Sequence, residues 1–163
     1  MVELLRKNFR RHHVLTREEC HLGRVINIDS SGKERALLTR NVVIAIQELM
    51  RQDKIDVKTR DLAAFITLAL QAIWKTIDTS VEAWEKRGYW LKADRFRMEW
   101  EWTNRLGQRL HDGVMNDDWD MIAQISVQVA EKLKSVKLPK RLPKSEPWDG
   151  AWEKLHLIKR EER

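Results

Sequence analysis

Three carboxylates near the middle of this chain have a type and spacing that could support metal chemistry. Glu82 and Glu85 are one helical turn apart, and Asp94 follows on what we predict to be the next helix. Oxygen ligands that converge from several helices can hold Mg²⁺ or Mn²⁺, and such an ion activates water or polarises a phosphoryl group. The sequence therefore permits a metal-dependent enzyme of all-α type with Glu82, Glu85 and Asp94 as ligands.

Ion pairs on helix surfaces are a competing explanation of the acidic residues in this region. The Glu-x-x-Glu spacing resembles that of all-helical nucleotide pyrophosphohydrolases, but no second Glu-x-x-Asp motif stands at a matching distance. Many of the acids have an arginine within one turn, as Glu99 has Arg95 and Glu101 has Arg97. Phosphate-loop, dinucleotide, serine-hydrolase and zinc-protease motifs are absent from the sequence. We therefore favour a non-enzymatic protein, without catalytic residues or cofactors, over the metal enzyme.

Tryptophan is concentrated in one stretch, since four of the eight tryptophans lie between Trp84 and Trp102. At about 100° per residue, the apolar residues from Tyr89 onward form two stripes on nearly opposite sides of a helix. One stripe consists of Tyr89, Ala93, Phe96, Trp100, Thr103 and Gly107, and the other of Leu91, Met98, Trp102 and Leu106. Both stripes belong to the core of a layered bundle, or one of them meets a partner.

The second stripe has the composition of a protein-binding surface. Tryptophan, methionine and arginine are enriched at the centres of interfaces, and Arg95 borders this stripe. Our favoured hypothesis is an interaction or assembly module that binds a second copy of the chain or another protein. Its binding residues are predicted to be Leu91, Met98, Trp102, Leu106 and Arg95.

Basic residues at the two ends of the chain suggest an alternative function. The formal net charge is +6 and the isoelectric point is about 9.6, and the excess of positive charge lies near the termini. Clustered positive charge attracts polyanions, and unpaired bases stack on aromatic rings. The alternative is therefore a nucleic-acid-binding accessory protein that uses Arg10, Arg11, Lys140 and Arg141 together with Trp90.

Length and composition restrict the class of protein. The 163 residues contain 34% charged and 42% apolar side chains, which is typical of a folded domain and too apolar for a disordered chain. No apolar run approaches the roughly 18 residues of a membrane-spanning helix, and the N-terminus lacks the features of a secretion signal. Cys20 is the one cysteine, so no intrachain disulfide can form. We expect a cytoplasmic protein without a membrane span.

Apolar periodicity predicts an all-α fold in which residues 31–136 form a bundle of about four main helices. The first helix is expected to end at 51–54. The second should start at Asp56 or Thr59 and be the most buried, with a possible restart at 78–80 and an interruption at Gly88. The tryptophan-rich helix should end at 111–113, and Asn116 or Asp117 should cap the fourth helix.

The two ends are predicted to be less regular than the bundle. Residues 1–30 form a basic arm, and its segment 22–29 is rich in β-branched residues and is expected to be extended. Residues 137–163 contain prolines at 139, 143 and 147, which favour an extended strap. Three apolar residues are predicted to hold this strap against the domain: Leu138, Leu142 and Trp148. A short helix should follow over 151–158.

Overall fold

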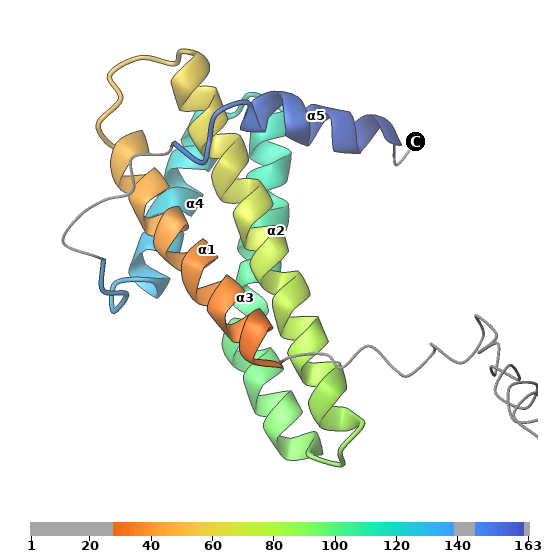
Figure 1. The fold of residues 1–163 in the computed structure, drawn as a ribbon. Helices are drawn as coiled ribbons and strands as arrows, with labels where there is room; N and C mark the ends of the chain where they lie inside the picture. The colour runs from red at the N-terminus through yellow and green to blue at the C-terminus, as the bar shows by residue number, and fades with distance from the viewer. Residues whose placement is uncertain (1–27, 139–145, 162–163) are drawn as a thin grey trace, which may run out of the picture.

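A computed structural model describes residues 28–138 and 146–161, and these residues form five helices and no strand (Figure 1). The helices are α1 (Ile28–Leu49), α2 (Val57–Glu85), α3 (Trp90–Met115), α4 (Trp119–Lys132) and α5 (Ala151–Glu161). The predicted all-α fold is therefore confirmed, with α1 to α4 as the four main helices and α5 as the short C-terminal helix. Most of the predicted basic arm and part of the predicted strap lie outside the described residues.

Helix α1 begins earlier than predicted. Ile28 and Asp29 were expected to be extended, but they form the first turn of α1, while residues 22–27 lie outside the description. The intrinsic preference of a β-branched residue is weak compared with the packing of the helix that it joins. That packing is provided by Val42, Ala45 and Ile46, which are buried against the rest of the bundle.

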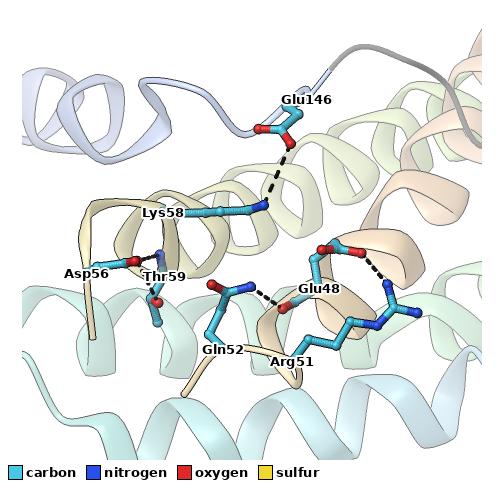
Figure 2. Close-up of polar contacts among 7 residues, drawn as sticks. All are labelled: Glu48, Arg51, Gln52, Asp56, Lys58, Thr59 and Glu146. Carbon is cyan, nitrogen blue, oxygen red and sulfur yellow. Dashed lines mark hydrogen bonds and ion pairs between the residues drawn. The ribbon is translucent and has the colours of Figure 1, made fainter. Parts of the chain in front are cut away.

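The turn between α1 and α2 is fixed by polar contacts (Figure 2). Asp56 caps α2 as predicted: the backbone N–H of Thr59 donates to its carboxylate at 2.9 Å, and this bond holds the pKa of the Asp56 carboxyl below its usual value. The hydroxyl of Thr59 donates to the carbonyl oxygen of Lys54 at 2.6 Å. On the α1 side, the amide of Gln52 donates to the carbonyl oxygen of Glu48 at 2.9 Å.

Helix α2 is the central element and is the most buried helix, as predicted. Its fully buried side chains include Leu62, Ile66 and Leu70, and it packs against α1, α3 and α5. The expected restart at 78–80 does not occur, because Ser80 donates to the carbonyl oxygen of Thr76 at 2.9 Å and so satisfies its hydroxyl within the helix. The interruption is at Gly88, whose φ of 79° is readily available only to glycine.

Two glycines of α3 allow neighbouring helices to approach closely. A Cβ atom on Gly107 would lie 3.3 Å from the Cβ of Leu70 on α2, and one on Gly113 would lie 3.3 Å from Ile122 on α4. Gly113 therefore serves packing inside the helix, and the predicted end of α3 at 111–113 was wrong. The cap of α4 is also shifted, because Asp118 accepts a hydrogen bond from the backbone of Met121 at 3.0 Å.

Helix α5 and the residues before it dock on α2. Trp148 is buried as predicted, with its ring edge-on to Phe65 at 6.4 Å between centroids. The buried carboxylate of Asp61 accepts hydrogen bonds from the backbone N–H groups of Gly150 at 3.4 Å and Trp152 at 2.9 Å. These N–H groups at the start of α5 have no partner within the helix, so Asp61 satisfies them and complements the helix dipole.

The helices of the bundle differ in length, and this leaves one end of the bundle thinner than the other. Helix α3 has 26 residues and α4 has 14, which correspond to about 39 and 21 Å at 1.5 Å per residue. Helix α4 turns back from the C-terminal end of α3 and covers only that part of it. Figure 1 shows the α2–α3 hairpin continuing beyond the ends of both α1 and α4. We call residues 77–100, which form this end of the hairpin, the hairpin tip.

Candidate functional site at the hairpin tip

The hairpin tip has a small core of its own. Ile77, Val81 and Ala93 are fully buried where α2 and α3 face each other. Trp84 and Phe96 pack on this cluster in an edge-on arrangement, with ring centroids 5.0 Å apart. Aromatic pairs of this geometry add to the free energy gained from burial alone. The two helices of the tip are therefore held together where α4 no longer covers them.

Large apolar side chains are nevertheless exposed on the tip. The exposed fraction is 62% for Trp90, 77% for Leu91 and 75% for Met98. Single exposed apolar residues are common on protein surfaces, but several together at one end of a domain indicate an interaction surface. The tip is therefore the candidate binding site of this chain.

A groove lies beside these exposed residues. Its volume is about 420 Å³, and it is lined by Trp84, Leu91, Lys92, Arg95, Phe96 and Glu99. The ammonium group of Lys92 lies 4.3 Å from the ring centroid of Trp84, in a cation–π contact. The groove therefore combines apolar surface with charged side chains of both signs at its edge. We call it the tip groove.

The predicted binding residues have different positions in the structure. Leu91 and Arg95 line the tip groove, and Met98 is exposed. Trp102 is partly buried and stacks on Trp100 with centroids 6.2 Å apart. Leu106 is only 2% exposed, so its assignment to a binding surface was wrong. The reason is that Leu106 belongs to the large core cluster that α2, α3 and α4 share, whereas Met98 lies outside that cluster.

Arg35 is a residue of the site that sequence reasoning missed. Its guanidinium carbon lies 4.8 Å from the ring centroid of Phe96 and 5.5 Å from that of Trp100. One of its nitrogens donates to the hydroxyl of Thr76 at 3.3 Å. Burial lowers the pKa of Arg35, and the nearby carboxylate of Glu99 acts in the opposite direction. No sequence signal links Arg35 to residues that are about sixty positions away.

The three carboxylates that could bind a metal are each placed beside a basic side chain. Arg97 contacts Glu85 at 3.1 Å and Asp94 at 3.7 Å, while Lys86 lies 4.0 Å from Glu82. Within residues 28–138 and 146–161, no three acidic, histidine or cysteine side chains are grouped as a metal site requires. These acids therefore form ion pairs with neighbouring basic side chains, either between α2 and α3 or along one helix.

A partly buried acid at the base of the tip leads to a prediction about pH. Burial raises the pKa of the Asp78 carboxyl, an effect that Arg97 opposes. The folded state then binds a proton more readily than the unfolded state, so stability decreases as the pH rises through the raised pKa. We expect Asp78→Asn to stabilise the protein at pH 7, by less than about 0.5 kcal/mol because the carboxylate remains partly solvated.

This gain should disappear near pH 3, where Asp78 is protonated in both states of the wild-type protein. Thermal unfolding of both proteins between pH 3 and pH 7 measures the difference. Glu131→Gln is a suitable control, because Glu131 is exposed on α4 and is not among the charges that act on Asp78. A lower melting temperature of Asp78→Asn at pH 7 would instead show that the attraction to Arg97 outweighs the cost of burial.

The residues predicted to bind nucleic acid are mostly outside the described part of the chain. This is true of Arg10, Arg11, Lys140 and Arg141, whereas Trp90 is exposed on the tip. The described residues carry as many acidic as basic side chains, so the whole formal charge of +6 belongs to the other segments.

The chain matches no protein-family model, no curated protein and no solved structure. In the described part of the chain, none of the helices combines the length and the apolar character needed to cross a membrane.

Proposed function

We propose that this chain is a non-enzymatic assembly module that self-associates through its hairpin tip. The observation that carries the proposal is the tip groove, with Leu91 and Met98 exposed beside it. Water is displaced from apolar surface when such side chains are covered, and each large side chain contributes about 1.5–3 kcal/mol when fully buried. A partner that covers the tip is therefore favoured over solvent.

The geometry of the bundle supports a second copy as this partner. Away from the tip, α1 and α4 pack with α2 and α3, so four helices share the core. Over most of the tip only α2 and α3 remain, and α1 reaches its base through Arg35 (Figure 1). Two tips that meet would supply two helices each and restore four helices around a common core. Such an arrangement uses the same surface on both copies, as is usual in symmetric dimers.

The charge of the described residues is compatible with self-association. Acidic and basic side chains are equal in number there, so two copies of the bundle do not repel each other through net charge. The edge of the tip groove also carries both signs, with Lys92 and Arg95 beside Glu99. A surface with both signs can be complementary to itself.

The test is the mass of the full chain in solution over a range of concentrations and salt. We expect sedimentation and light scattering to give a mass that rises toward twice the 19.4 kDa of one chain. Because the contact is mainly apolar, the dimer should persist when the salt concentration is raised. A mass of one chain at every concentration would contradict the proposal.

The alternative function is tested in the same samples by adding single-stranded nucleic acid. Binding to phosphates through basic side chains weakens steeply with salt, by close to one decade of affinity per decade of salt for each contact. Quenching of tryptophan fluorescence that follows this dependence, with a mass of one chain, would favour nucleic-acid binding over self-association.

A further inference from the structure

We infer that two hairpin tips pair antiparallel about a two-fold axis, with Arg95 of each copy facing Glu99 of the other. This inference rests on the proposed self-association and specifies its geometry. Arg95 and Glu99 are four residues apart on α3 and line the same groove. They therefore share one edge of the helix and carry opposite charges.

Antiparallel pairing reverses the order of residues along the helix. Suppose that the two-fold axis passes midway between Arg95 and Glu99, at the level of residue 97. Each residue of one copy then lies opposite the residue of the other copy for which the two residue numbers add up to about 194. Arg95 then faces Glu99 of the second copy, and Glu99 faces Arg95. A single self-complementary edge thus gives two ion pairs, as the symmetry of such an interface requires.

The same axis gives roles to the apolar residues of the tip. Leu91 comes opposite the level of residues 102–103 in the second copy, where Trp102 is partly exposed at the end of the region that α4 covers. Lys92, whose ammonium group lies over Trp84 of its own copy, comes to the same level. The end of each tip therefore lies next to the part of the other copy where that other copy becomes a four-helix bundle.

A parallel arrangement is disfavoured for two reasons. It would place Arg95 level with Arg95 of the second copy and Glu99 level with Glu99, so that like charges meet. It would also bring the thicker ends of the two bundles, where α1 and α4 join the hairpin, to the same level (Figure 1). In the antiparallel arrangement the thicker ends point away from each other.

Arg95 is available for a contact between copies. The ion pairs found in the described part of the tip involve Arg97 with Glu85 and Asp94, and Lys86 with Glu82. Arg97 lies on the opposite side of α3 from the groove and holds the hairpin together. Arg95 is exposed at the edge of the groove, where a carboxylate from a second copy can reach it.

The experiment is a charge exchange on the full chain. Arg95→Glu alone places two pairs of carboxylates against each other in the dimer. Glu99→Arg alone places two pairs of cations together and also puts a cation near Arg35 within each copy. We expect each single variant to raise the dissociation constant at least about tenfold. The double variant, Arg95→Glu with Glu99→Arg, restores both pairs with reversed sign and should return the constant to within about threefold of wild type.

Sedimentation equilibrium measures the dissociation constants, and circular dichroism confirms the fold of each variant. Arg40→Glu is the matched control, since it makes the same charge change on the exposed surface of α1 and should leave association unchanged. If wild type dimerises but the double variant is as weak as the single variants, the antiparallel pairing is overturned while the assembly function stands. If wild type stays a single chain, the proposed function itself fails.

Discussion

Leu106→Ala is expected to lower the free energy of unfolding by about 2–5 kcal/mol, the range for removing a buried leucine side chain. Leu106 is 2% exposed and belongs to the same core cluster as Leu70, Leu110 and Ile125. The substitution removes three carbon atoms that contact this cluster, and the close approach of α2 at Gly107 leaves little freedom for the helices to fill the space. Urea denaturation at a protein concentration where wild type is a single chain, monitored by circular dichroism, measures the loss.

The matched control is Leu91→Ala on the same helix. Leu91 is 77% exposed, so its truncation should change the stability of the single chain by no more than about 0.5 kcal/mol. The sequence places these two leucines in the same apolar stripe of α3, whereas the structure separates them into surface and core. Equal losses of stability for the two variants would contradict that separation.

The double variant Leu91→Asp with Met98→Asp should abolish self-association at concentrations where wild type dimerises. Both side chains are at least 75% exposed in the single chain, so the fold should be retained. In the dimer each copy would have to bury two carboxylates without partners, and the one at residue 98 would lie close to the two-fold axis. We expect the dissociation constant to rise by at least about 100-fold, which corresponds to roughly 2.7 kcal/mol. Light scattering on samples of equal concentration gives the mass of each variant.

Met50→Asp is the control for a general effect of adding charge. Met50 is 67% exposed and lies in the turn between α1 and α2, at the opposite end of α2 from the tip. The variant should dimerise as wild type does. If Met50→Asp lost association as completely as the tip variant, the contact between copies would lie elsewhere on the bundle.

Helix number and the bounds of α2 followed from the sequence, because an amphipathic helix has a period that is visible in a single chain. The stripe from Leu62 to Trp84 predicted α2, and the polar residues before it predicted its cap at Asp56. Glycine was harder to interpret. Gly88 ends a helix through its backbone conformation, while Gly113 allows α4 to approach from within α3, and the two cases differ only in their neighbours.

The tip groove was only partly predictable. Leu91, Arg95 and the exposure of Met98 were expected from the second stripe of α3, but the contribution of Trp84 and the contacts of Arg35 were not. Trp84 enters the groove from α2 across the hairpin turn, and Arg35 reaches Phe96 from α1. Contacts between different helices depend on how the helices are placed, and periodicity carries no information about placement.

The sequence by itself determined that α3 has two apolar faces, because the angular spacing of its residues is fixed by the geometry of the helix. The tertiary structure decided which part of each face is covered. Helix α4 is shorter than α3 and runs back along it, so Leu106 becomes core while Leu91 and Met98 stay exposed. Burial depends on the relative length and direction of neighbouring helices, and these are properties of the packed bundle rather than of any one segment.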